Sequence, residues 1–267
     1  MNKFYIQIVF FLLSISLYVK NKTLAADATP EKATKPKLPR HCPTSEEIYE
    51  KNKDLLCTNP KEIANAVKLM NEAATHLEHH ATCKDGYTLL EERPGNMFLY
   101  KKKHKDHTNV ERIIYSVDNP NKYNEIINQI WDPNHASPFN NGDVKITRVY
   151  NPNLVMIQQR YKKDFLGRQK YFYALVKKVQ ISEDTTVIVM ASADINDHNP
   201  SSKEFKNTII ENVNLFKADI DSEDDIRNGK LRKTFVNIAG YLIKKKYNSY
   251  IDMTFVASVR DKQVLII

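Results

Sequence analysis

Two groups of side chains have the types and the spacing of metal ligands. Asp194, Asn196 and His198 alternate like the first ligands of an EF-hand loop, but the loop lacks its Gly at the sixth position and its Glu at the twelfth. His76 and His80 would share one face of a helix and could chelate a metal, although a helix C-terminus favours histidines electrostatically in any case. We therefore expect neither a metal nor another cofactor.

The common catalytic signatures are missing from the chain. There is no G-x-S-x-G nucleophile elbow and no H-E-x-x-H helix, and the six glycines build neither a phosphate loop nor a dinucleotide fingerprint. Scattered Ser, His and Asp residues could meet in space, as they could in any chain of this length. The sequence thus favours a binding protein over an enzyme.

The formal net charge is +8, and three lysine clusters occur where strands are expected to end. They comprise residues 101–103, 162–163 and 244–246. Solvated strand ends are the simplest interpretation. A surface attracted to anionic lipid headgroups is the functional alternative, since each nearby Lys or Arg contributes about 1 kcal/mol. Nucleic acid is not expected as a partner, because no basic and aromatic recognition motif is present.

The N-terminus has the pattern of a secretory signal. Lys3 precedes an apolar run over residues 4–19, and small residues near Ala25 suit a cleavage site. We predict a signal peptide over residues 1–25; a membrane anchor is the alternative, but the run is short for a bilayer. Residues 26–43, rich in Ala, Thr, Pro and Lys, are expected to form a disordered linker, which leaves one domain over residues 44–267.

Three cysteines allow one disulfide in an oxidising compartment and leave one thiol over. Cys57 and Cys83 bracket an expected helix, so a bridge between them requires the chain to fold back. A bridge between Cys42 and Cys57 would instead tie down the linker. The sequence does not choose between these pairings.

The elements that would position any site are two helices and a series of strands. Asn59 and Pro60 begin a helix whose apolar residues recur at three- and four-residue steps, with Glu62 placed for a capping box. Asn119-Pro120 caps a second helix, which Trp131-Asp132-Pro133 ends. Strands are expected at residues 87–92, 97–103, 110–117, 144–150, 154–163, 171–181, 185–195, 214–220, 234–244 and 250–259. This order predicts an α+β fold in which helices lie against a curved antiparallel sheet.

The strand-rich half resembles START lipid-transfer domains. The likeness rests on the segments 154–161, 167–168 and 171–175, on Trp131-Asp132 and on Gly240-Tyr241-Leu242-Ile243. The segments 58–60, 107–110, 123–127, 149–153 and 237–241 further resemble the fam-a multigene family of rodent malaria parasites, from about residue 44 to residue 259.

This resemblance implies a helix-grip fold, a curved antiparallel sheet around a long helix with a lipid between them. It also implies binding and transfer of phospholipid, with phosphatidylcholine as the ligand, by a protein secreted into the parasitophorous vacuole or exported to the host cell. The alternative is a host-interaction or membrane-surface protein that keeps the scaffold without transferring lipid. Export has no motif to support it, because residues 22–26 lack the Arg and the acid of the usual pentapeptide.

One departure from the START pattern concerns the C-terminus. A START chain continues from its last strand into a long helix that closes the cavity, whereas only residues 260–267 follow the last strand expected here. We expect either that another surface covers the cavity or that this copy is shortened and binds lipid poorly.

If a cavity exists, its wall comes from one face of each central strand. Alternation places Ile146, Arg148 and Tyr150 on one face, where Arg148 could meet the lipid phosphate or an acid such as Asp194. A structural salt bridge or solvent exposure is the alternative. Other candidates for the cavity wall are a choline cage of Tyr161, Tyr171 and Tyr173, an end plug formed by Trp131, and the lining residues Met156, Ile188, Met190, Ile238 and Tyr241. These aromatic and apolar residues could equally be ordinary sheet residues.

Overall fold

The computed structural model describes residues 42–260, apart from 106–107, 136–141, 164–166, 202–204 and 248. The predicted signal peptide, almost all of the predicted linker and the last seven residues lie outside this range. Within the described residues, no helix combines the length and the apolar character needed to span a membrane.

The observed elements confirm the α+β prediction. The first half of the chain forms α2 (Ser45–Lys51), η1 (Lys53–Leu55), α3 (Pro60–Thr82), β1 (Thr88–Arg93), β2 (Met97–Lys103), β3 (Asn109–Asp118), η2 (Pro120–Lys122) and α4 (Tyr123–Trp131). The second half forms β4 (Gly142–Asn151), β5 (Leu154–Tyr161), β6 (Lys170–Ser182), β7 (Thr185–Ala191), β8 (Asp194–Asn196), η3 (Glu211–Leu215), β9 (Lys217–Asp219), α5 (Asp224–Arg227), β10 (Arg232–Lys233), β11 (Val236–Lys245) and β12 (Tyr250–Val259).

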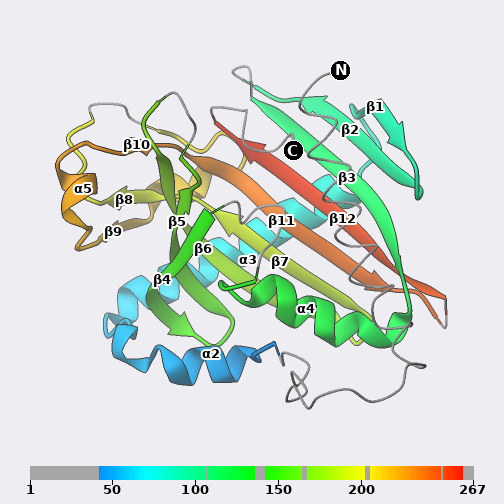
Figure 1. Ribbon diagram of the computed structural model, residues 1–267, viewed down its shortest axis with the longest axis horizontal. Helices are drawn as coiled ribbons and strands as arrows, with labels where there is room; N and C mark the ends of the chain where they lie inside the picture. The colour runs from blue at the N-terminus through cyan, green and yellow to red at the C-terminus, as the bar shows by residue number, and fades with distance from the viewer. Residues whose placement is uncertain are drawn as a thin grey trace, which may run out of the picture. The chain divides into compact units, whose positions relative to one another are not determined.

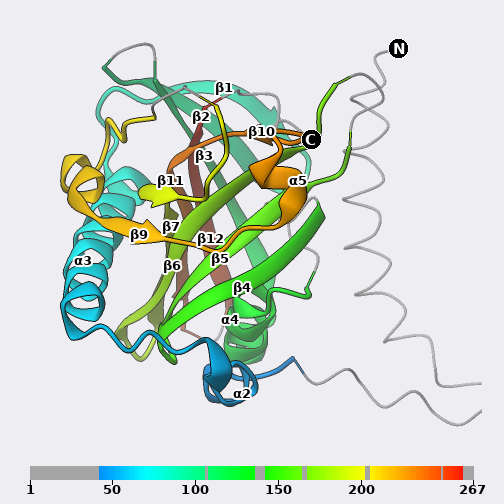
Figure 2. The same cartoon turned by 90° about the vertical axis from the view of Figure 1, so that its left-hand side faces the viewer.

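One large curved sheet carries the fold. Its strands follow the order β1-β2-β3-β12-β11-β7-β6-β5-β4 and pair antiparallel along this path, while the short β10 pairs parallel with β6. Helix α3 lies on one side of the sheet and α4 on the other, as Figures 1 and 2 show from two directions. We call these two sides the α3 face and the α4 face.

Helix α3 begins where its sequence predicts. The Asn59 side chain accepts hydrogen bonds from the backbone N–H groups of Lys61 (3.0 Å) and Glu62 (3.2 Å), with Pro60 at the first helical position. The helix then packs its buried stripe, which includes Met70 and Leu77, against β6, β7, β11 and β12. The predicted capping box is not formed, because the Glu62 carboxylate bonds side chains of β4 instead.

Helix α2 was not expected from the sequence. The Thr44 hydroxyl accepts from the Glu47 N–H (3.2 Å), and the Glu47 carboxylate accepts from the Thr44 N–H (2.7 Å). This reciprocal pair is a capping box, and its Thr-x-x-Glu signature was available in the sequence.

The segment between β7 and β11 also differs from the expectation. The strand predicted over residues 185–195 ends at Ala191, and the one predicted over residues 214–220 is reduced to the three residues of β9. Apolar side chains of this segment, among them Ile195, Ile210 and Phe216, join α3 in the core on the α3 face. The segment is therefore a second cover for that face rather than an extension of the sheet.

Candidate ligand-binding site

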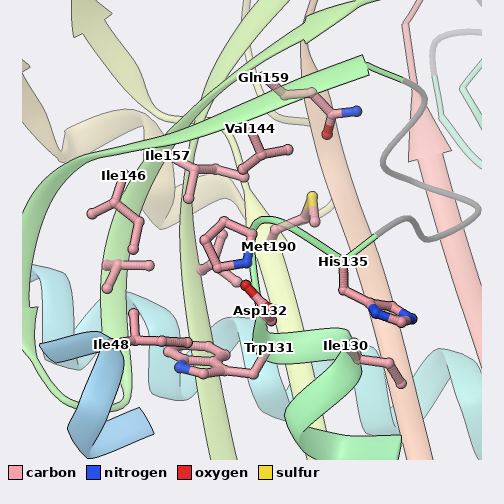
Figure 3. A pocket seen from close by; sticks show the side chains of 13 residues that line it. Ile48, Ile130, Trp131, Asp132, His135, Val144, Ile146, Ile157, Gln159 and Met190 are labelled. Carbon is pink, nitrogen blue, oxygen red and sulfur yellow. The ribbon is translucent and has the colours of Figure 1, made fainter. Parts of the chain in front are cut away.

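The candidate site is a pocket on the α4 face. Ile48 of α2, Trp131 of α4, Ile146 of β4, Ile157 of β5 and Met190 of β7 supply most of its apolar wall, as Figure 3 shows. The pocket also borders Asp132, His135 and Gln159, so its polar groups are few. Its volume is about 60 Å³. An apolar wall with few polar groups suits an apolar ligand.

Strand alternation explains which side chains reach the pocket. Ile146 pairs with Ile157, and Val155 and Gln159 follow on the same side of β5, whereas Met156 between them points into the α3-face core. Both faces of β5 are buried, and this fixes which of its side chains point to each face.

Helix α4 is held over the sheet by one hydrogen bond and one large ring. The Tyr123 hydroxyl donates to the Thr186 hydroxyl of β7 (2.9 Å) at the start of the helix. At its end Trp131 is 6% exposed and lines the pocket, with the Lys178 ammonium 5.7 Å from its ring centroid. Burial lowers the pKa of Lys178. The predicted position of Trp131 at one end of a cavity is consistent with this arrangement.

A β-bulge overturns the predicted placement of Arg148 and Tyr150. The register between β4 and β5 shifts between Ile146, which pairs with Ile157, and Arg148, which pairs with Met156. One extra residue on a strand moves all following side chains to the other face. Arg148 and Tyr150 therefore lie on the α3 face, and only Ile146 of the predicted trio faces the pocket.

Arg148 has a structural partner on that face. Its guanidinium donates to the Glu62 carboxylate of α3 (2.8 Å) and to the Asp219 backbone carbonyl (2.7 Å), and the Tyr150 hydroxyl donates to the same Glu62 oxygen (2.7 Å). Burial, and then the neighbouring Glu62 charge, raises the pKa of Tyr150 above its usual range. The structural ion pair is thus confirmed, whereas the predicted partner Asp194 is exposed and lies 3.7 Å from Lys217.

The predicted choline cage is not formed. The rings of Tyr171 and Tyr173 lie 6.1 Å apart in the α3-face core, where Tyr171 donates to Asp197 (2.9 Å) and Tyr173 accepts from Gln158 (2.6 Å). Tyr161 alternates onto the α4 face and packs against Phe172 at 5.7 Å. The three tyrosines therefore cannot surround one cation.

The remaining predicted lining residues divide between the two faces. Met156 and Ile238 belong to the α3-face core, so their assignment to the cavity wall is wrong. Ile188 and Tyr241 are paired neighbours on β7 and β11, in phase with Met190 on the α4 face but beyond the pocket wall. Burial raises the pKa of Tyr241 well above its usual value. The apolar surface therefore continues from the pocket across β7 and β11.

The three cysteines are free thiols. Cys57 precedes α3 and Cys83 caps its C-terminus, so the 23 residues of a straight helix separate them. At 1.5 Å per residue this is roughly 35 Å, far beyond the ~4.4–6.8 Å between the Cα atoms of a disulfide. The pairing of Cys57 with Cys83 is excluded, and the alternative pairing of Cys42 with Cys57 is not formed either.

The fold is similar to solved structures of lipid-transfer domains. The chain matches the crystal structure of human STARD10 with a TM-score of 0.51 and 12% identity, covering 72% of this chain and 68% of that one. It matches human StAR-related lipid transfer protein 5 with a TM-score of 0.52 and 11% identity, covering 73% and 81%. No family model and no curated protein matches the sequence. The likeness confirms the START-like helix-grip fold.

Proposed function

We propose that the α4 face of the sheet binds a lipid, with an acyl chain in the pocket beneath α4. The observation that carries this proposal is the asymmetry of the sheet. On the α4 face Trp131, Ile157 and Met190 enclose a void, whereas the α3 face is filled by α3 and by the segment before β11. One protein of similar fold, human StAR-related lipid transfer protein 5, is named for lipid transfer, which supports the same ligand class.

The pocket must widen before it can hold a whole lipid. Its volume of about 60 Å³ is well below the ~300–1,000 Å³ of sites for drug-sized ligands. Trp131 and Ile48 close it on the side of α4 and α2. We infer that lipid entry displaces these two short helices from the sheet and leaves β5 and β7 in place.

The finer proposal follows the resemblance to the fam-a family. The ligand is a phospholipid, phosphatidylcholine, and the protein is secreted by a malaria parasite and moves the lipid between membranes without a chemical step. Carriage alone is sufficient for transfer, because shielding each acyl methylene from water is worth about 0.8 kcal/mol.

Native mass spectrometry tests lipid binding directly. We expect the protein purified from eukaryotic cells to carry a stoichiometric lipid, which extraction then identifies. A lipid with a photoreactive acyl chain should label peptides of α4, β5 and β7, and it should leave the buried face of α3 unlabelled. A folded protein without lipid, or labelling on α3, would contradict the proposal.

A second candidate function is favoured by the small volume of the pocket. A protein that keeps the scaffold and binds a host surface needs no cavity larger than the 60 Å³ described above. This function predicts that no lipid copurifies and that substitutions which fill the pocket leave binding to the host surface unchanged.

A further inference from the structure

Five cations gather at one end of the sheet, and we call this surface the basic end. They are Lys162 and Lys163 after β5, Arg168 and Lys170 before and at the start of β6, and Lys230 just before β10. Lys170 is half-buried and the other four are exposed. Figure 2 shows β10 and α5 beside the ends of β5 and β6.

The fold holds these residues close together. Arg160 pairs with Tyr171, and the Gln169 side-chain amide donates to the Tyr161 carbonyl (2.7 Å), so the end of β5 lies beside the start of β6. The β10 segment is fixed alongside by the parallel pairing of Arg232 with Lys170 and by a hydrogen bond from the Arg168 guanidinium to the Gly229 carbonyl (3.1 Å).

Two of the acidic residues around α5 are engaged with other bases. Asp225 bonds Arg160 at 2.6 Å, and Glu223 bonds Lys145 at 3.1 Å. Among the described residues, none of the five cations of the basic end forms an ion pair. The basic end therefore keeps a concentrated positive charge that an anionic surface could neutralise.

The basic end continues the rows of side chains that line the candidate site. On β6, Val176 lines the pocket, and Ala174, Phe172 and Lys170 precede it at two-residue steps on the same face. On β5, Gln159 lines the pocket and Tyr161 follows it. A lipid that leaves the pocket along these strands would reach the basic end.

We propose that the basic end docks on the anionic surface of a membrane and aligns the lipid-binding face with it. This inference rests on the proposed function. A bilayer fits better than nucleic acid, because Tyr161 and Phe172 are buried against each other and so provide no stacking platform for bases.

The opposite end of the sheet supplies a matched control. Lys244 and Lys245 end β11 there and Lys246 follows it, but the Asp252 carboxylate lies 3.6 Å from the Lys246 ammonium. The two ends thus carry lysine clusters of similar size in different electrostatic surroundings.

Vesicle sedimentation tests the docking proposal. The full chain expressed in eukaryotic cells is mixed with phosphatidylcholine vesicles, with and without phosphatidylserine. We expect binding only with phosphatidylserine, and weaker binding as salt screens the charges. Replacing Lys162, Lys163 and Lys230 by Glu should weaken binding roughly a hundredfold, because three cations that attract the anionic membrane are lost. The same change at Lys244, Lys245 and Lys246 should have a much smaller effect.

Each outcome decides between the alternatives. Equal binding by wild type and the triple variant of the basic end, or a larger loss in the control variant, would overturn the proposal. Binding to double-stranded DNA with no binding to either vesicle would make this surface a nucleic-acid site and overturn it as well. Native mass spectrometry of the same preparations reports the bound lipid separately, so a failure of lipid binding is distinguishable from a failure of docking. If the Glu variant does not fold, the corresponding Gln variant replaces it.

Discussion

The two faces of the sheet are built from the same strands but bury different kinds of side chains. The α3 face buries ion pairs and tyrosines under two covers, with Arg148 bonded to Glu62, Arg160 to Asp225 and Tyr171 to Asp197. The pocket wall on the α4 face consists mainly of aliphatic side chains, with Trp131 above it. A half-buried charged group needs fixed partners, so the α3 face tolerates little displacement. An apolar contact has no such directional requirement, and this leaves the α4 face able to admit a ligand.

The largest expected contrast comes from two adjacent residues of β6. Leu175 is fully buried in the α3-face core, whereas Val176 lines the pocket. We expect Leu175→Ala to lower the free energy of unfolding by about 3 kcal/mol, because the close-packed core cannot collapse around the cavity that it leaves. Val176→Ala should cost about 1 kcal/mol, since it only enlarges an existing void. Urea unfolding measures both, and equal losses would remove the distinction between the faces.

Removing the carboxylate that bonds Arg148 should have the next largest effect. Glu62→Ala leaves the guanidinium and the Tyr150 hydroxyl without their shared acceptor, and we expect a loss of about 2 kcal/mol, discounted because Arg148 is partly exposed. Glu50→Ala, which removes an exposed ion pair with Lys53, should leave the stability almost unchanged.

The same comparison predicts that Arg148→Ala destabilises the fold and leaves the lipid content unchanged. If the Arg148→Ala variant remains folded but its native mass spectrum shows no lipid, Arg148 contributes to lipid binding and the prediction is wrong.

The sequence predicts a structural feature well when that feature depends on contacts between residues that are close in the chain. Asn59 and Pro60 define a helix start through contacts two and three residues away, and the alternation in β5 defines a strand locally. The bulge after Ile146 has no such local signal, because Arg148 changes face to reach Glu62, 86 positions away. Site residues before the bulge, such as Ile146, could therefore be predicted, while Arg148 and Tyr150 could not.

The tyrosines illustrate the same limit. The sequence does not show on which face of β6 Tyr171 and Tyr173 lie. Their position on the α3 face depends on the segment that brings Asp197 within hydrogen-bond distance of Tyr171. Helix α2, in contrast, was predictable, since Thr44 and Glu47 lie only three positions apart.

The α3 face should also be the acid-sensitive one. Burial, and then the positive neighbours His79, Lys102 and His104, lowers the pKa of His80 to about 4, and the Tyr87 hydroxyl lies 3.0 Å from its Nδ1. In the unfolded chain the pKa is about 6.5, so the unfolded state binds the proton first as the pH falls. Stability is therefore lost between pH 6.5 and about 4, and at pH 5 the loss from this group is about 2 kcal/mol.

Denaturant titrations at pH 5 and 7.5 measure this loss. His80→Gln should reduce the difference between the two pH values, whereas His79→Gln, at the exposed neighbouring position, should retain most of it. An unchanged pH dependence in His80→Gln would show that carboxylates alone cause the loss.

The smallest expected effect on stability is the most informative for function. Met190 lies on β7 at the wall of the pocket and is only half-buried. Met190→Trp should fill much of the 60 Å³ void at a cost of about 1 kcal/mol or less, because the α4 face can yield where the core cannot. The same substitution should exclude an acyl chain and reduce the copurified lipid several-fold in native mass spectra. A variant that loses stability but keeps its lipid would place the ligand elsewhere. A variant that keeps its stability and loses its lipid would establish that the α4 face is reserved for a ligand.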